Sequence, residues 1–274
     1  MTSREVDADP GQAWRALLEE PGQYEHHCRT KQEFRQTKRL GLVWRRVLSA
    51  TRLRPPARVF ELGCGGGKHL AGLAVAGYSV HGVDIAPAVV ERARHYLDEV
   101  NVHRLIAATV EQGNILTYDT ASRAGSFDMC FHVGVVEHFL SATDRSLIWQ
   151  KLVELTAPGG WVVSVVPCGM HFLRQRVRTE RLLGYNVPEI DYSCATHTLE
   201  FQSAGLAEVV CLPHNFLGFL SAHPVAWLRG PARLPLYAAA NVLGPLLPLP
   251  NSVKERSAGS LIVLARKPRH GQER

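Results

Sequence analysis

Apolar and polar residues alternate in blocks along most of this chain of 274 residues. Short apolar runs typical of strands are separated by longer stretches in which apolar residues recur at helical spacing. This alternation predicts an α/β protein with a doubly wound, mostly parallel sheet and helices on both of its faces. The predicted strands lie at 57–62, 78–84, 107–112, 127–133, 159–166, 207–212 and 259–267, and the predicted helices at 11–20, 30–50, 68–77, 86–100 and 141–155.

A glycine-rich stretch, "VFELGCGGGKHL" at 59–70, follows the first predicted strand. A strand, a glycine-rich turn and a helix bring backbone N–H groups close to a ligand, because glycine tolerates positive φ and has no Cβ. The dinucleotide fingerprint is incomplete, since Lys68 stands where its third glycine belongs, and no Gly-Lys-Ser/Thr of a P-loop follows. The stretch alone therefore predicts a closely held ligand without identifying it.

Four further segments follow the glycine stretch in order: "VHGVDIAP", "EQGNIL", "FDMCFHVGVVEHF" and "LTAPGGWVVSVV". Across 58–167, the five segments together resemble the ordered motifs of class I S-adenosylmethionine-dependent methyltransferases. The resemblance implies an enzyme with S-adenosylmethionine as its cofactor and S-adenosylhomocysteine as its product. It also implies a Rossmann-like sheet of seven strands, in which the last two strands form an antiparallel pair.

The resemblance further implies which residues bind the cofactor. The glycine loop would pass under the methionine and ribose, Glu61 would lie near the ammonium group, and Asp84 would accept from the ribose hydroxyls. Asp84 could instead only cap a helix. Asn114 stands where the family usually has Asp, and its amide oxygen can still accept a hydrogen bond from the adenine amine. The implied set is Glu61, Gly63, Gly65, Gly67, Asp84, Ile85, Asn114, Ile115, His132 and Val133.

The acceptor side of the site is less well defined by the motifs. Methyl transfer needs an aligned acceptor and often a base that removes its proton. His138 is the histidine best placed by motif, although the Glu-His pair is often structural in this family. Tyr24, His26 and His27 lie in "QYEHHC", within a region that often covers the pocket. One of the three could contact the acceptor, with Tyr24 and His27 as the candidates chosen, or all three could form a surface turn. His171 lies in the segment after the fifth predicted strand, which in this family is another usual source of contacts with the acceptor. No cluster of metal ligands is indicated, so we expect no metal.

Two other segments suggest contacts with an acceptor or a partner. Residues 29–58 carry ten Lys or Arg and one acid, which indicates either a solvated helix face or a basic rim that attracts an anionic acceptor. Residues 213–258 form a long insertion between the last two strands, and its proline-rich part at 234–250 is uncharged. We expect it to cover the acceptor pocket. A homodimer contact and attachment to a membrane surface are the alternatives.

These segments divide the chain into an N-terminal helical cap (1–54), a cofactor-binding core (55–212), the insertion (213–258) and a last strand with a tail (259–274). The six cysteines form no CxxC pair, so we expect reduced, buried thiols. The polar N-terminus is unlike a secretory signal, and the chain holds no apolar run long enough to span a membrane. We therefore expect a cytoplasmic protein.

The most specific function predicted is methylation of a small-molecule acceptor in specialised, natural-product metabolism. The net charge of +6 does not establish a nucleic-acid partner, and no NPPY-like motif of a nucleic-acid methyltransferase is present. A nucleic-acid methyltransferase and a non-catalytic scaffold that binds S-adenosylmethionine are the alternatives. The sequence does not distinguish transfer to oxygen, nitrogen or carbon.

Overall fold

The computed structural model describes residues 24–180, 182, 187–225, 230–231 and 233–269, and the helix predicted at 11–20 lies outside them. The main helices are α2 (Lys31–Thr37), α3 (Leu42–Thr51), α4 (Lys68–Val75), α5 (Pro87–His103), α6 (Ala142–Leu155), α7 (Arg174–Thr179), α8 (Cys194–Ser203), α10 (Arg233–Leu243) and α11 (Asn251–Lys254). The strands are β1 (Arg58–Leu62), β2 (Ser79–Asp84), β3 (Ala108–Gln112), β4 (Phe127–Val133), β5 (Thr156–Pro167), β6 (Ala207–Phe216) and β7 (Ala258–Arg266).

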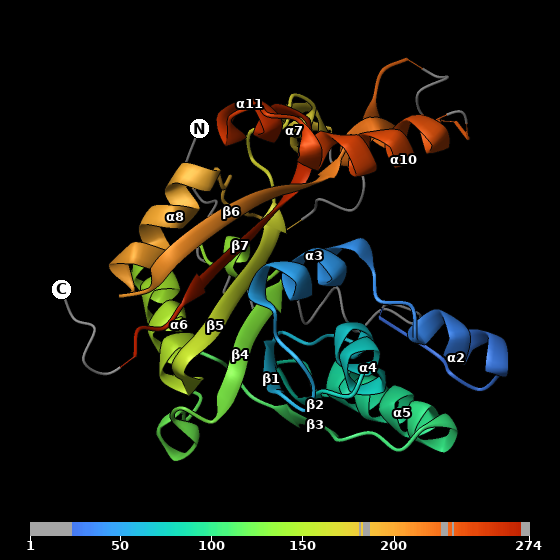
Figure 1. Cartoon of the computed structure of the whole chain (residues 1–274), viewed down its shortest axis with the longest axis vertical. Helices are drawn as coiled ribbons and strands as arrows, with labels where there is room; N and C mark the ends of the chain where they lie inside the picture. The colour runs from blue at the N-terminus through green and yellow to red at the C-terminus, as the bar shows by residue number, and fades with distance from the viewer. Residues whose placement is uncertain (1–23, 181, 183–186, 226–229, 232, 270–274) are drawn as a thin grey trace, which may run out of the picture.

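The strands form one seven-stranded sheet in the order β3-β2-β1-β4-β5-β7-β6 (Figure 1). All neighbouring pairs are parallel except those of β7, which runs antiparallel to both β5 and β6. The predicted fold class and the antiparallel closing pair are therefore confirmed. The order reverses between β1 and β4, and in such sheets ligands bind beyond the carboxyl ends of the strands at this switch point.

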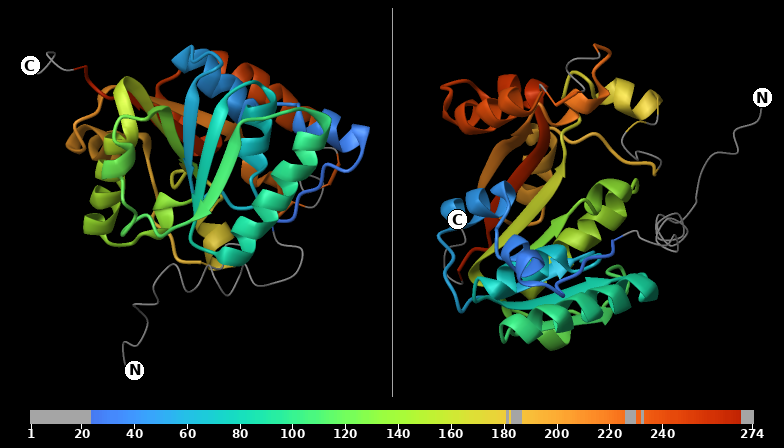
Figure 2. Two further views of the ribbon diagram at one scale, coloured as in Figure 1. Left: turned by 90° about the horizontal axis from the view of Figure 1, so that it is seen from below. Right: turned by 90° about the vertical axis from the view of Figure 1, so that its right-hand side faces the viewer.

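Helices cover both faces of the sheet (Figure 2). One apolar core joins the sheet to α3, α4 and α5 through side chains such as Trp44, Leu70 and Val90. The other joins it to α6 and α8 through Trp149 and Phe201. These two layers hold the carboxyl ends of the parallel strands in fixed positions, which is the condition for a precise site there.

Local sequence explains where several helices begin. Pro87 occupies the first turn of α5, where its fixed φ suits the helix and its missing N–H costs no bond. Ser141 caps α6 by accepting from the backbone N–H of Asp144, so of the two predicted caps, Ser141 and Thr143, the structure selects the first. Thr30 and Glu33 form a capping box at the start of α2.

The insertion lies at the carboxyl edge of the parallel strands, because β6 ends and β7 begins there. Its longest helix, α10, is anchored by side-chain bonds from Tyr237 to Asn215 and from Asn241 to the backbone of Phe216. The insertion also carries many exposed apolar side chains, both on α10 and after it: Leu234, Leu236, Val242, Leu243, Leu246, Leu247, Leu249 and Val253. Among the residues described, no helix has the length and apolar character needed to cross a bilayer.

The expectation of reduced cysteines is wrong for two of the six. Cys194, the first residue of α8, forms a disulfide with Cys211 in β6, with their Cα atoms 5.6 Å apart. The two residues are 17 positions apart in the sequence, so no short motif predicted the pair. Packing of α8 against the sheet brings them together. Cys28, Cys64, Cys130 and Cys168 are free, buried thiols, as predicted.

Loss of this disulfide is expected to destabilise the protein by about 3 kcal/mol, the chain-entropy value for a closed loop of this length. Urea unfolding with and without dithiothreitol measures the effect as a shift in the transition midpoint. The double variant Cys194→Ser, Cys211→Ser should unfold at the midpoint of the reduced wild type and should not respond to the reductant. Equal midpoints for oxidised and reduced wild type would contradict a stabilising role.

Candidate cofactor and active site

The glycine loop leaves β1 with three of its glycines in the left-handed region, with φ of +64° at Gly63, +52° at Gly65 and +75° at Gly67. The backbone N–H of Gly63 donates to the carbonyl of Val83 on β2, with an N–O distance of 2.7 Å. A Cβ on Gly63 would lie 2.5 Å from Cγ2 of Val135. The sequence therefore places glycine where both the conformation and the close packing require it.

Asp84, the last residue of β2, holds the loop in place. One carboxylate oxygen accepts from the N–H of Gly65 at 2.9 Å, and the other accepts from the N–H of Ala86 at 3.1 Å. Burial raises the pKa of this carboxyl, while the backbone hydrogen bonds act in the opposite direction. Each oxygen keeps a lone pair for a ligand hydroxyl. The carboxylate thus caps the turn and can also bind a ligand.

A cavity of about 330 Å³ opens beside the glycine loop. Its floor is the loop itself, and Val133 at the end of β4 contributes to its wall. Two side chains from the N-terminal segment, Tyr24 and His26, cover it. The lining residues are Tyr24, His26, Glu61, Gly63, Cys64, Gly65, Gly66, Lys68, His69 and Val133.

Glu61 is the residue of the cavity with the most unusual environment. Its side chain belongs to β1, is 1% exposed, and its Oε2 atom has no hydrogen-bond partner. Burial raises the pKa of this carboxyl well above its ordinary value, and the nearby charge of Asp84 raises it further. A buried carboxylate without a partner is costly. A cationic ligand group at this place would remove that cost.

Cofactor binding is expected to depend on pH through Glu61. Below its raised pKa the carboxyl is protonated and does not attract an ammonium group, whereas above it the carboxylate does. The affinity for S-adenosylmethionine should therefore rise with pH above the ordinary titration range of a glutamate, by about tenfold or more, since a charged hydrogen bond contributes roughly 1.5–3 kcal/mol.

Calorimetric titrations of wild type and the isosteric Glu61→Gln variant test this expectation. The variant should bind more weakly at pH 8 and show a flatter pH profile, and the difference between the two profiles removes the titration of the ligand itself. Glu91→Gln, at an exposed position of α5, is the control. Parallel profiles for wild type and Glu61→Gln would refute the role of Glu61.

The residues predicted to bind adenine lie beside Asp84 at the ends of β2 and β3. The N–H of Gly113 donates to the carbonyl of Asp84 and joins the two strand ends. Ile85 is half-buried and Ile115 is buried. The Oδ1 atom of Asn114 accepts from the N–H of Leu116 at 3.0 Å, so this side chain shapes the turn. The placement is consistent with an adenine pocket, and their binding roles stay predictions.

Of the two histidines considered in the N-terminal segment, the structure brings His26 to the site and not His27. Tyr24 lies over Gly65, and its backbone carbonyl lies against Gly66. His26 lines the cavity, whereas His27 is exposed and turned toward Glu99, 3.8 Å away. Burial, followed by the charge of Lys68, lowers the pKa of His26. The segment therefore covers the glycine loop, but His27 does not reach it.

Three other predicted histidines lie outside the lining of this cavity. His132 is fully buried within the sheet, where its Nε2 is 2.8 Å from Oγ of Ser164. His138 follows β4, and its Nδ1 is 3.0 Å from the carbonyl oxygen of Pro188. His171 is buried against Phe172 and Phe219, and burial lowers its pKa to about 4. The cofactor-binding role of His132 and the catalytic roles of His138 and His171 stay predictions, since none of the three lines this cavity.

Sequence reasoning considered His26 only as one of three possible contacts, and it missed His69 as a lining residue. The indole N–H of Trp44 donates to Nδ1 of His69 at 3.0 Å, and burial lowers the pKa of this histidine to about 4. His69 lies one residue into α4, whose first turn faces the loop. Its position directly after the glycine motif was the available signal.

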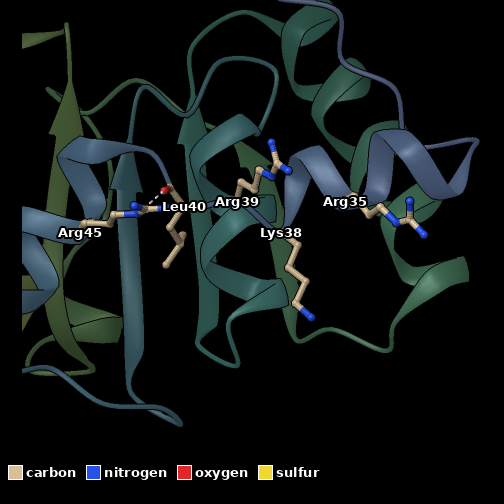
Figure 3. A pocket seen from close by; sticks show the side chains of 5 residues that line it. All are labelled: Arg35, Lys38, Arg39, Leu40 and Arg45. Carbon is tan, nitrogen blue, oxygen red and sulfur yellow. Dashed lines mark hydrogen bonds between the residues drawn. The ribbon is translucent and has the colours of Figure 1, made fainter. Parts of the chain in front are cut away.

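The basic residues of the N-terminal helices border a separate depression of about 480 Å³ (Figure 3). Its lining consists of Arg35, Lys38, Arg39, Leu40 and Arg45. The charged ends point in different directions and do not converge on one point, and Arg45 donates to the carbonyl of Leu40. This arrangement resembles a solvated face. A contribution to acceptor attraction stays a prediction.

Comparison with known proteins agrees with this geometry. Residues 60–164 match a family described as "Methyltransferase domain". The ubiquinone biosynthesis O-methyltransferase of Xanthomonas axonopodis pv. citri is 34% identical over 112 residues, which are 40% of this chain and 44% of that protein. The Bordetella pertussis protein of the same name is 32% identical over 106 residues, covering 38% and 40% respectively. The chain thus spans less than half the length of these two relatives.

Solved structures share the fold over a larger part of the chain. A methyltransferase from Archaeoglobus fulgidus that depends on S-adenosylmethionine aligns with a TM-score of 0.56 at 14% identity, covering 82% of this chain and 93% of that one. Haemonchus contortus phosphoethanolamine N-methyltransferase 2, in complex with S-adenosyl-L-methionine, aligns with a TM-score of 0.54 at 17% identity, covering 82% and 53%. At such identities, the likeness concerns the fold alone.

The chain contains a class I S-adenosylmethionine-dependent methyltransferase domain, and S-adenosylmethionine is the cofactor of this class. The geometry and chemistry of the cavity also fit that cofactor. The glycine loop lets a ligand approach the backbone, Asp84 offers lone pairs to hydroxyls, and the unpartnered carboxyl of Glu61 suits an ammonium group. That these residues bind S-adenosylmethionine is a prediction, which the Glu61→Gln and Asp84→Asn variants test.

Proposed function

We propose that this protein transfers a methyl group from S-adenosylmethionine to an oxygen atom of a small-molecule acceptor. The main observation is the cavity that joins the buried, unpartnered carboxyl of Glu61 to the end of β4 at Val133. It combines a place for the cationic end of the cofactor with an opening at the sheet edge, where an acceptor can approach. The named activity of the curated relatives, O-methylation in ubiquinone biosynthesis, supports oxygen as the acceptor atom.

When bound, S-adenosylmethionine supplies a methyl group activated by its sulfonium. The new O–C bond forms as the S–C bond breaks, S-adenosylhomocysteine leaves, and the acceptor hydroxyl loses its proton. His26 is suited to receive this proton, because its lowered pKa leaves the imidazole neutral at pH 7. His69 is not, since its Nδ1 already accepts from Trp44 and its neutral ring carries the proton on Nε2.

The insertion supports an acceptor with a substantial apolar part. It lies at the same sheet edge as the cavity and packs on the segment after β5, where Phe219 contacts the ring of His171 at 4.9 Å between centroids. Its exposed leucines offer apolar surface next to that edge. A cover for the acceptor pocket is the role we favour, with a homodimer contact as the alternative. A natural-product acceptor stays a prediction.

The test is transfer of labelled methyl from S-adenosylmethionine to defined acceptors. The panel contains hydroxylated aromatic compounds with and without an apolar chain, matched amines, and RNA and DNA. We expect label on the hydroxylated compounds with an apolar chain. Label on amines or nucleic acid would overturn the proposal, and cofactor binding without any transfer to the panel or to a metabolite extract would favour a non-catalytic scaffold.

A further inference from the structure

A compact group of buried polar side chains lies just beyond the cavity wall. Glu137 and His138 belong to η2 (Val136–His138), the single turn after β4, and Glu189 comes from the segment between α7 and α8. Each offers one potential metal-ligand atom, and these three atoms all lie within 4.8 Å of one another. All three residues are buried. The buried Arg174 pairs with Glu189, so one of the two carboxylates has a cationic partner, whereas none is recorded for Glu137 among the residues that the structure describes.

Glu137 supplies an independent sign that a ligand belongs there. Its side chain is 1% exposed, and its Oε2 atom has no hydrogen-bond partner. Leaving a buried carboxylate oxygen unpaired is destabilising. Coordination to a cation would remove this cost directly. The N–H of Ile190 donates to the carbonyl of Glu137 at 2.8 Å, and this bond holds the segment of Glu189 against η2.

The other two side chains each have a hydrogen-bond partner outside the group. Nδ1 of His138 lies 3.0 Å from the carbonyl oxygen of Pro188, so Nδ1 donates to it and Nε2 is the nitrogen that would coordinate a cation. One oxygen of Glu189 accepts from Arg174, and Arg174 in turn donates from Nε to Asp191 at 3.0 Å. Hydrogen bonds from a ligand to such outer partners fix its orientation and strengthen metal binding.

We propose that Glu137, His138 and Glu189 bind one divalent transition-metal cation, for which Zn²⁺ and Mn²⁺ are the appropriate probes. An imidazole with carboxylates suits these ions. Three protein ligands leave at least one coordination position open, as in catalytic rather than structural zinc sites. The sequence had indicated no metal, because Glu189 lies 51 positions after His138 and no spacing motif joins them.

The location connects this site with methyl transfer. Val135, two residues before Glu137, packs on Gly63 of the glycine loop, and Val133 lines the cavity. The group thus follows the same strand end that lines the cavity, and a cation bound there would favour the deprotonated form of an acceptor hydroxyl that reached its open position. This catalytic role rests on the proposed function, whereas metal binding itself does not.

The test is metal binding by the full chain without any acceptor. The protein is stripped with EDTA, desalted and titrated calorimetrically with Zn²⁺ and, separately, Mn²⁺, with elemental analysis of the reloaded protein. We expect one equivalent of bound metal and a higher unfolding temperature. Glu137→Gln, which preserves shape, should weaken binding at least tenfold.

Glu99→Gln is the matched control, because Glu99 also lies beside histidines, His27 at 3.8 Å and His95 at 3.2 Å, but is only partly buried and has Arg29 as a cationic partner at 2.7 Å. It should leave the binding unchanged. No binding of either ion, or an equal loss in both variants, would overturn the proposal and indicate that Arg174 alone balances the cluster. If Glu137→Gln fails to fold, the absence of any metal-dependent rise in the unfolding temperature of wild type would overturn it equally.

S-adenosylmethionine titrations separate this proposal from the proposed function. Glu137→Gln should keep the cofactor affinity of wild type, because Glu137 does not line the cofactor cavity. Methyl transfer by metal-free protein at the full rate would remove the catalytic role of the ion and leave the proposed function intact. If the metal-loaded protein transfers no methyl group, the proposed function is contradicted and the metal site stands.

Discussion

Replacement of Asp84 by Asn is expected to weaken the binding of S-adenosylmethionine by about 100-fold, because charge-assisted hydrogen bonds contribute roughly 1.5–3 kcal/mol each. The carboxylate has two tasks, since it accepts from the N–H groups of Gly65 and Ala86 and can accept from a ligand hydroxyl. The amide of the variant has one oxygen and presents N–H donors to one of these partners. Calorimetric titration at pH 7.5 measures the affinity, and thermal unfolding measures any loss of stability.

Asp119→Asn is the matched control for this variant. Asp119 makes the same local bond as Asp84, accepting from the N–H two residues ahead, Ala121, at 3.0 Å, but on an exposed turn. It should leave the cofactor affinity unchanged. If Asp84→Asn also retains wild-type affinity, Asp84 is a turn cap and nothing more.

Replacement of Gly63 by Ala is expected to lower the free energy of unfolding by about 2–5 kcal/mol. The left-handed φ of +64° costs a residue with a Cβ roughly 1–2 kcal/mol. The new methyl would lie 2.5 Å from Cγ2 of Val135, and such overpacking adds roughly 1–3 kcal/mol. Relief of the contact would shift the loop, so we expect cofactor affinity to fall by tenfold or more, measured with urea unfolding and calorimetry on the same preparation.

Two further variants separate the causes. Gly205 has a φ of +80° and no atom within 4 Å of a Cβ built on it, so Gly205→Ala should show the backbone cost alone and leave cofactor binding unchanged. Adding Val135→Ala to Gly63→Ala should restore the part that comes from overpacking. A Gly63→Ala protein as stable as Gly205→Ala, with full cofactor affinity, would contradict the close packing of the loop.

The sheet and the cofactor edge could be predicted because their signals are local. A strand, four glycines in five positions and a helix specify a turn that ends at Lys68, and Asp84 follows at the end of the next strand. The alternation of strand and helix then restricts the order of the parallel strands. The antiparallel β6 and β7 follow from the resemblance to a known class, and the structure confirms them.

Residues that come together from distant segments could not be predicted in the same way. His26 and His27 are adjacent and chemically identical in the sequence, yet one lines the cavity and the other turns to Glu99. The choice depends on how the N-terminal segment crosses the loop. Cys194 and Cys211 are likewise paired through the docking of α8 on β6, which carries no short motif.

By itself, the sequence determined the class of the domain and predicted where its cofactor binds, because glycine conformation, strand periodicity and the acidic residue at the end of β2 act over a few neighbouring positions. Only the tertiary structure decided which side chains share an environment. The desolvation of Glu61, the disulfide and the group formed by Glu137, His138 and Glu189 all depend on burial and on distances between segments far apart in the chain. Such properties arise when the layers pack, and no local pattern encodes them.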